Sequence, residues 1–128
     1  MIVMYTSEGC SSCRKARKYL KDNDLSFIEK NINKEQLNEE EVRYLLRRSE
    51  NGTDDLISQR SKIIKESDID IENMSTSDLV TFITENPTVL KRPIIIDDRD
   101  MQTGYDEDQI SIFKRNNTRK QQLAHAAV

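Results

Sequence analysis

Apolar runs and helix-like stripes alternate along the first part of the chain. Residues 2–5 form an apolar run that predicts a strand, and residues 11–21 carry the periodicity of a helix with one buried face. The expected members of that face are Cys13, Ala16 and Leu20. Residues 25–32 predict a second strand. Two strands joined by a short helical connection favour a parallel pair in one sheet.

The pattern then becomes wholly helical. Asn38 and Glu41 have the spacing of a capping box, which predicts a helix start, and Asn51 with Gly52 predicts the end of that helix. The further elements expected here are a connector over residues 53–58 and helices over residues 59–66 and 76–85. A minimal strand-helix-strand layout needs none of these helices. We therefore interpret residues 33–86 as an inserted helical lobe.

Strand-like patterning returns near residue 93. Pro93 opens an apolar strand that ends at Ile96, a turn rich in aspartate follows, and residues 101–103 predict a fourth strand in a hairpin with the third. A closing helix is predicted over residues 106–113. Beyond it no apolar periodicity remains, so we predict a flexible basic tail over residues 114–128.

Together these elements predict an α/β fold. The expected architecture is a thioredoxin-like mixed four-stranded sheet with an inserted helical lobe between the second and third strands. Residues 1–113 should form a single domain, whose thioredoxin-like part comprises residues 1–32 and 87–113. A chain of 128 residues can bury a core without the help of disulfides, so its cysteines are free to have a function.

The charges are nearly balanced over the whole chain but clustered locally. A net charge of −3 argues against a protein that binds nucleic acid with its whole surface. The basic clusters are Arg14, Lys15, Arg17 and Lys18; Arg43, Arg47 and Arg48; and Lys114, Arg115, Arg119 and Lys120. No apolar run reaches the roughly 18 residues of a membrane span and no signal-like segment is recognised, so we expect a cytoplasmic protein without membrane contact.

The only two cysteines, Cys10 and Cys13, stand at the predicted turn from the first strand into the helix. Orphan N–H groups, the positive end of the helix dipole and the basic cluster that follows all favour thiolate over thiol. We interpret the pair as a thiol–disulfide centre, with the more exposed Cys10 as the attacking thiolate and Cys13 as the resolving partner. The alternative is two small buried hydrophobic residues.

A metal site is disfavoured. Structural zinc sites need about four ligands, but there is no second cysteine pair, and the single histidine, His125, lies in the polar tail. We expect neither a metal nor a cofactor.

Two groups of basic residues are further candidates. Arg92 stands directly before Pro93 at the cysteine end of the predicted sheet, and a cis bond there would hold it beside Cys10; a surface ion pair is the alternative. Arg60 is a weaker candidate. A second group is expected on the outer face of the helix predicted to start at Asn38, and its members are Tyr44, Arg47 and Arg48. An ordinary solvated helix face explains that group equally well.

Three separated blocks of sequence resemble one known family. They are YTSEGCSSCRKA at residues 5–16, NGTDDLISQRS at residues 51–61 and LKRPIIID at residues 90–97. In this order the blocks are similar to those of the Spx regulators of the arsenate-reductase-like (ArsC) family, which has a thioredoxin-type fold. The resemblance covers residues 1–113.

Arsenate reductases of that family hold an oxyanion with a cysteine and three arginines. The resemblance assigns Cys10, Arg60 and Arg92 to three of these four positions. The missing arginine would fall in residues 104–107, where this chain has Gly-Tyr-Asp-Glu. Each charge-assisted hydrogen bond is worth about 1.5 to 3 kcal/mol, so its loss disfavours turnover. We expect no enzyme; an arsenate reductase or glutaredoxin-like thiol oxidoreductase is the alternative, and a constitutive binding module with incidental cysteines is a third interpretation.

The resemblance to the Spx regulators implies a redox-sensing global transcription regulator. Such a protein would bind the C-terminal domain of the RNA polymerase α subunit, interfere with activator-stimulated transcription and activate thiol and oxidative-stress genes. Its implied switch is a Cys10–Cys13 disulfide. The implied α-subunit contact contains Gly52, next to the outward Tyr44, Arg47 and Arg48. A glycine there either lets a partner backbone approach closely or merely ends the helix.

Further partners follow from the same resemblance. Lys62 is a candidate contact to promoter DNA, which the protein would bind only together with the polymerase. The small apolar residues at the end, Ala126–Val128, suit recognition by a ClpXP-type protease with an adaptor, although a frayed end explains them equally well. We expect a monomer.

Overall fold

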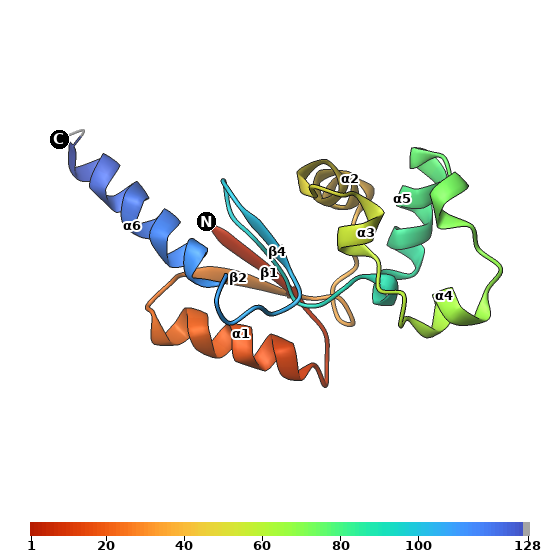
Figure 1. The fold of residues 1–128 in the computed structure, drawn as a ribbon, viewed down its shortest axis with the longest axis horizontal. Helices are drawn as coiled ribbons and strands as arrows, with labels where there is room; N and C mark the ends of the chain where they lie inside the picture. The colour runs from red at the N-terminus through yellow and green to blue at the C-terminus, as the bar shows by residue number, and fades with distance from the viewer. Residues whose placement is uncertain (127–128) are drawn as a thin grey trace. The chain divides into compact units, whose positions relative to one another are not determined.

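The computed structural model describes the backbone of residues 1–126 and the side chains as far as Gln121. The chain divides into two compact units, whose elements are labelled in Figure 1. The first unit comprises Met1–Lys30 and the chain from Arg92 onward, and the second comprises Asn31–Lys91. The predicted inserted lobe, residues 33–86, falls within the second unit. Each unit has its own packing and is described by itself.

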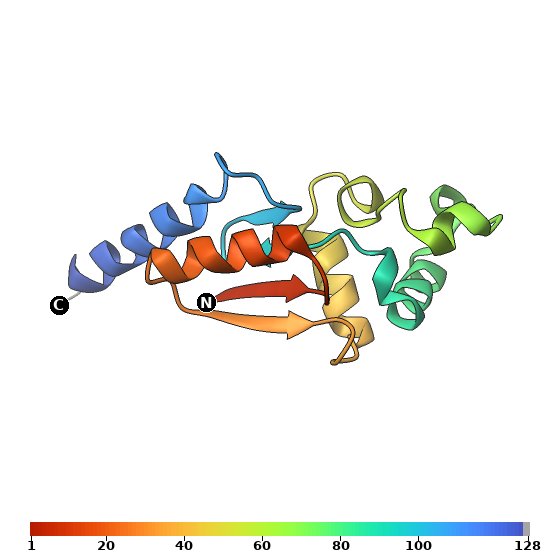
Figure 2. The same cartoon turned by 90° about the horizontal axis from the view of Figure 1, so that it is seen from below.

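The first unit is built on a four-stranded sheet. Its strands are β1 (Ile2–Thr6), β2 (Phe27–Asn31), β3 (Ile94–Ile96) and β4 (Met101–Thr103). They lie in the order β2-β1-β3-β4, and β3 pairs antiparallel with both β1 and β4. β1 and β2 run side by side in the same direction (Figure 2). The predicted mixed, thioredoxin-like sheet is therefore confirmed.

Helix α1 (Ser11–Asp22) covers one face of this sheet (Figures 1 and 2). Its predicted apolar stripe is confirmed, because Cys13, Ala16 and Leu20 are all buried. The core beneath it also contains Ile2, Met4, Leu25, Ile95, Ile110 and Phe113. Full burial of one such aliphatic or aromatic side chain stabilises the fold by about 1.5 to 3 kcal/mol, so this face supplies much of the unit's stability.

The last helix, α6 (Ser111–Ala126), departs from the sequence prediction. A closing helix was expected over residues 106–113 with a flexible tail after it, whereas the helix begins only at Ser111 and the backbone stays helical to Ala126. Lysine, arginine, glutamine and alanine favour helix without an apolar stripe. The side-chain amide of Asn116 also donates to Asp97 at 3.0 Å and to Asp100 at 2.8 Å, which ties α6 to the β3–β4 turn.

The proposed protease signal lies at the edge of what is described. Ala127 and Val128 fall outside the described residues, so the expected recognition of Ala126–Val128 stays a prediction. Among the residues that the structure does describe, no helix is long and apolar enough to cross a membrane.

The second unit is helical, as predicted. Its helices are α2 (Glu39–Arg48), α3 (Thr53–Leu56), α4 (Lys62–Glu66) and α5 (Thr76–Glu85), with 3-10 turns at Ile71–Asn73 and Pro87–Val89. The capping box at the start of α2 is present, since Asn38 accepts from the Glu41 N–H and Glu41 accepts from the Asn38 N–H. Near the end of this unit, an isolated antiparallel β-bridge joins Ile57 to Leu90.

One helix boundary was predicted wrongly. Helix α2 ends at Arg48 with Ser49 as its C-cap, not at Asn51 and Gly52. Gly52, with φ 58° and ψ −125°, instead precedes α3, where residues 53–58 were expected to be only a connector. Its carbonyl accepts the N–H groups of Asp55 and Leu56. The glycine therefore starts a new helical turn rather than ending the old one.

Candidate functional site

Cys10 and Cys13 stand where β1 passes into α1. Cys10 has an extended backbone and is the N-cap of the helix. Its sulfur accepts a hydrogen bond from the Cys13 N–H at 3.1 Å, and its carbonyl accepts one from the Arg14 N–H at 3.2 Å. Before it, Gly9 has a positive φ of 68°, which lets the chain turn from strand to helix. The sulfur of Cys10 thus satisfies one of the orphan donors at the helix start.

The two sulfur atoms are joined in a disulfide, with the Cα atoms 5.2 Å apart. Cys13 is 1% exposed, whereas Cys10 is partly exposed. Thiol–disulfide exchange requires that one sulfur be accessible to the incoming group. The difference in exposure favours Cys10 as the sulfur that reacts first.

A network of three polar side chains, Thr6, Arg17 and Glu29, joins β1, α1 and β2. Glu29 of β2 receives two hydrogen bonds from Arg17 of α1, at 2.6 and 2.7 Å, and a third from the hydroxyl of Thr6 at 2.9 Å. Thr6 is fully buried. The hydrogen bonds from Arg17 hold the pKa of Glu29 below its usual range, and the same contacts raise the pKa of Arg17.

The Thr6–Arg17–Glu29 network changes the expected electrostatics of the cysteine pair. The charge of Arg17 is compensated by Glu29, and Lys18 forms an ion pair with Asp22 at 2.6 Å. Within the described part of the chain, Arg14 and Lys15 take part in no ion pair. Half of the basic cluster is thus left to favour a thiolate at the helix start.

Arg92 lies in the first unit and is half-buried. Its peptide bond to Pro93 is cis. Burial lowers the pKa of its guanidinium, although arginine remains charged at neutral pH. Among the described residues its side chain makes no hydrogen bond or ion pair. The surface ion pair that was the alternative role is therefore not formed, and a role beside Cys10 stays a prediction.

Two other predicted residues lie in the second unit. Arg60 is exposed, and its N–H donates to the Ser58 hydroxyl at 3.3 Å. Lys62 is the exposed first residue of α4. Nothing in their own surroundings assigns them a ligand, so their expected roles toward an oxyanion and toward DNA remain predictions.

Tyr105 stands where the resemblance to arsenate reductases would require an arginine. Its side chain is partly buried and packs against the core of the first unit. An aromatic ring in this position contributes packing and offers no cation for an oxyanion. The local packing therefore agrees with the sequence argument against reductase chemistry.

The structure brings together three of the predicted interface residues on α2. Tyr44 is 39% exposed, and the guanidinium carbons of Arg47 and Arg48 lie 5.8 and 5.5 Å from its ring centroid. Arg48 also donates a hydrogen bond to the tyrosine hydroxyl. We refer to Tyr44, Arg47 and Arg48 as the α2 cluster. Cation–π contacts of this kind restrict the motion of the exposed ring and of the two arginine side chains.

Gly52 follows the α2 cluster in the chain, at the start of α3. A Cβ built on it meets no atom within 4 Å, so the space in front of this glycine is open. The loop that contains it is held by Asp55, whose carboxylate accepts from the N–H of Asn51 at 2.8 Å. This bond lowers the pKa of Asp55. The result is an open, fixed stretch of backbone beside an aromatic and basic helix end.

Sequence reasoning missed two features of the first unit. The Thr6–Arg17–Glu29 network could have been suspected, because opposite charges stand on a helix and on the strand that follows it. Gln102 of β4 is only 8% exposed, and within the described residues neither polar atom of its side chain has a hydrogen-bond partner. Its short strand reads as ordinary polar sequence, so no pattern marked its burial.

Comparison with known proteins identifies the family of this chain. The model of the ArsC family matches residues 5–113. The chain belongs to the ArsC family. The match spans both cysteines, the α2 cluster and the Arg92–Pro93 bond, so the candidate site residues lie within the family region.

Two relatives in the ArsC family are similar over nearly their whole length. The chain is 44% identical to the global transcriptional regulator Spx of Bacillus subtilis over 126 residues, which covers 98% of this chain and 96% of that protein. It is 45% identical to the protein of the same name from Streptococcus agalactiae, covering 100% and 93%. Both of these ArsC-family relatives are named as regulators rather than as enzymes.

A solved ArsC-related structure confirms the fold. A crystal structure of a protein from Bacteroides fragilis, described as ArsC family related, has a TM-score of 0.76 and covers 88% of this chain and 96% of its own. Its sequence identity is 18%, so this likeness concerns the fold alone.

Proposed function

We propose that this protein is a redox-sensing transcription regulator that binds the C-terminal domain of the RNA polymerase α subunit. The observation that carries the proposal is the disulfide at the start of α1 in a chain that is 44% identical, over its whole length, to a global transcriptional regulator. Promoter DNA would be contacted only in the presence of the polymerase, with Lys62 as one candidate contact.

The switch is the oxidation of one dithiol to one disulfide. The Cys10 thiolate attacks a sulfur of a low-molecular-weight disulfide and releases one thiol. The Cys13 thiolate then attacks Cys10 in the mixed disulfide and releases the second thiol. Two electrons pass to the oxidant, and the two protons lost by the cysteines end on the two released thiols. No other co-reactant is required.

The interface would be formed by the α2 cluster and Gly52. The cluster presents a partly exposed aromatic ring flanked by two cations, which is a composition typical of binding hot spots. The open space in front of Gly52 would admit the backbone of a partner. An acidic surface on the polymerase subunit would complement this patch.

The interface predicts the effect of two substitutions. Gly52→Arg places a long cation where the partner must approach, and Arg47→Ala removes one cation of the α2 cluster. Each is expected to weaken binding of the purified α C-terminal domain at least tenfold, measured by isothermal titration with the disulfide intact.

Controls separate the interface from folding. Gly52 has a positive φ, so any side chain there strains the backbone; Gly52→Ala carries the same strain with little bulk and reports that contribution. Lys65→Ala removes an exposed cation of α4 in the same unit and is expected to bind normally. If Gly52→Arg and Arg47→Ala both bind like the unaltered protein, the proposed interface is wrong.

Thiol reductase chemistry is the less supported function. Arsenate reduction in this family needs several cations around the attacking cysteine, and the position of one of them is held by Tyr105, packed against the core. The relatives that align with nearly the full length of this chain are named as regulators. The protein is therefore proposed to act through binding rather than turnover, as a monomer whose level an ATP-dependent protease controls.

A further inference from the structure

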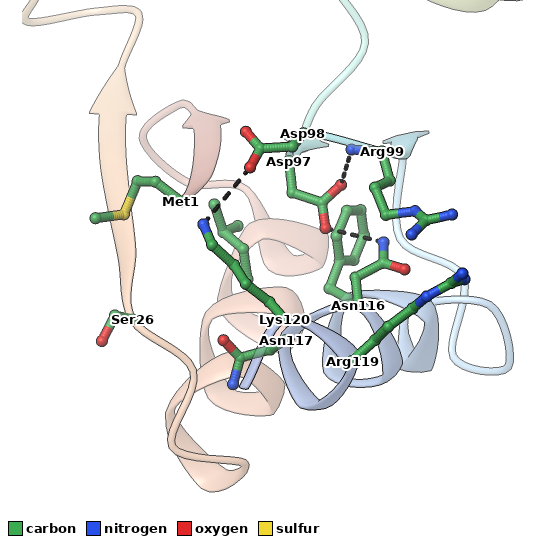
Figure 3. A pocket seen from close by; sticks show the side chains of 11 residues that line it. Met1, Ser26, Asp97, Asp98, Arg99, Asn116, Asn117, Arg119 and Lys120 are labelled. Atoms are coloured by element: carbon green, nitrogen blue, oxygen red, sulfur yellow. Dashed lines mark hydrogen bonds and ion pairs between the residues drawn. The ribbon is translucent and has the colours of Figure 1, made fainter. Parts of the chain in front are cut away.

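A cavity of about 440 Å³ lies in the first unit, between α6, the start of β1 and the β3–β4 turn. β1 begins at the cavity and ends just before the cysteines, so the cavity is at the opposite end of the sheet from the disulfide. Its lining contains none of the residues assigned to the cysteine pair or to the proposed interface. Figure 3 shows it from close by.

The inner wall of the cavity is apolar. Phe113 lies behind this wall and is fully buried, and Ile2 is 6% exposed, so both are core members and only the edge of Ile2 is open to a ligand. Met1 adds a further apolar side chain at the opening. Binding pockets for small molecules are typically of this size and this apolar character, with a few polar groups that fix orientation.

The charges around the opening are not balanced. Asp97 accepts from the N–H groups of Arg99 and Asp100 and from Asn116, and Asp98 is paired with Lys120 at 3.6 Å. Both carboxylates therefore already have partners from the protein itself. The contacts to Arg99, Asn116 and Lys120 are the dashed lines of Figure 3.

Two cations at the opening have no such partner. Among the described residues, the guanidinium groups of Arg99 and Arg119 make no hydrogen bond or ion pair, although both side chains line the cavity. In Figure 3 both lie on the side of the cavity away from Met1 and Ser26. Asp98 and Lys120 cancel as an ion pair, whereas Asp97 keeps its charge because its hydrogen-bond donors are neutral. The two guanidinium charges therefore exceed the one remaining carboxylate charge, and the net charge of these groups is positive.

We propose that this cavity binds a small amphiphilic monocarboxylate, whose apolar body lies along Met1 and the accessible edge of Ile2 and whose carboxylate meets Arg99 and Arg119. Guanidinium groups bind carboxylates through charge-assisted, often bidentate hydrogen bonds. A water molecule occupies about 30 Å³ of liquid, so the cavity holds the volume of about fifteen waters, which suits a ligand of about ten heavy atoms. A stable interface with another protein would instead bury about 800 Å² of accessible surface on each partner, which calls for a broad surface rather than a single cavity.

Octanoate is the probe for this site, with 1-octanol and acetate as matched comparisons. Octanol has the same apolar body without the charge, and acetate has the charge without the body. In a titration of the full-length protein followed by amide NMR, octanoate is expected to shift the resonances of Ser26 and Asn117. Octanol is expected to bind about tenfold more weakly, and acetate to cause no saturable shift.

Variants test the two arginines directly. The double variant Arg99→Gln, Arg119→Gln is expected to weaken octanoate binding about tenfold while leaving octanol binding unchanged, and the unchanged octanol binding shows that the cavity is intact. Arg115→Gln is the matched control, because Arg115 lies on the same helix but outside this cavity and donates to Ser111. It is expected to bind octanoate normally.

Three results would overturn the proposal. The first is equal binding of octanoate and octanol, which would leave the arginines without a role. The second is an unchanged octanoate affinity in the double variant. The third is a set of octanoate shifts confined to residues away from the cavity.

Discussion

At the scale of single residues, Glu29 has the most measurable consequence. Its pKa is lowered by Arg17, so the charged form is stabilised in the folded protein. The contribution is therefore complete above the ordinary glutamate pKa of about 4.3 and is lost as the pH falls through the lower folded value. Glu29→Gln is expected to reduce the free energy of unfolding by about 1 kcal/mol at pH 7, and this deficit is expected to shrink as the pH falls through the folded pKa of Glu29.

Urea unfolding of both proteins between pH 7 and pH 3 measures this difference. Asp22→Asn is the matched control, because it breaks the exposed pair with Lys18 on the same helix and should leave stability unchanged. A deficit in Glu29→Gln that stays constant over the whole pH range would contradict an electrostatic origin.

Residues also mark where sequence reasoning reaches its limit. Cys13, Ala16 and Leu20 were predicted correctly because helical periodicity reports directly which face is buried. The burial of Gln102 could not be predicted, since its strand shows no apolar pattern; in the sheet it pairs with Ile95, which in turn pairs with Met4. Burial of a polar side chain on an edge strand depends on what covers that edge, and local pattern does not record it.

At the scale of elements, the strands and the helices α1, α2 and α5 could be predicted, whereas α3 and the extent of α6 could not. Helix α3 spans only Thr53–Leu56 and has no periodicity to detect. α6 is polar beyond Phe113, so its helix is stabilised by propensity and by a docking contact instead of an apolar stripe. Periodicity identifies only those elements that bury a face.

The docking contact of α6 gives a prediction for that element. Asn116→Ala removes the amide that joins Asp97 and Asp100 to the helix, and the two carboxylates are then left close together without their shared donor. Amide hydrogen exchange in residues 117–121 is expected to become about tenfold faster, because charge-assisted hydrogen bonds are worth about 1.5 to 3 kcal/mol.

Asn117→Ala is the control for that measurement. Asn117 lies on the same helix turn and lines the cavity, but among the described side chains it has no hydrogen-bond partner. Its exchange rates are expected to match those of the unaltered protein. Equal rates in the two variants would show that α6 does not depend on the β3–β4 turn.

At the scale of the whole molecule, the proposed switch and the proposed interface belong to different units. Cys10 and Cys13 lie in the first unit, while the α2 cluster and Gly52 lie in the second. The chain passes between the units after Lys30 and again after Lys91, directly before Arg92. Sequence could predict each group separately, because each has a local pattern, but it could not predict how far one affects the other.

This separation makes the redox response measurable. Reduction of the disulfide is expected to shift the amide resonances of Gly52 and Tyr44 as well as those around Cys10, and to change the affinity for the polymerase α C-terminal domain. The double variant Cys10→Ser, Cys13→Ser should show no response to reductant. If the resonances of the second unit stay fixed while only the first unit responds, oxidation does not act through the α2 cluster.

The cap at the start of α1 joins two equilibria that are usually studied apart. The sulfur of Cys10 is both the acceptor that starts the helix and one half of the disulfide. By thermodynamic reciprocity, any ligand, substitution or temperature change that favours the first helical turn in one oxidation state must shift the midpoint potential of the dithiol by the equivalent free energy. The response of the dithiol to an oxidant therefore also depends on the stability of the first turn of α1. A change in temperature is expected to shift the midpoint potential of the Cys10–Cys13 pair.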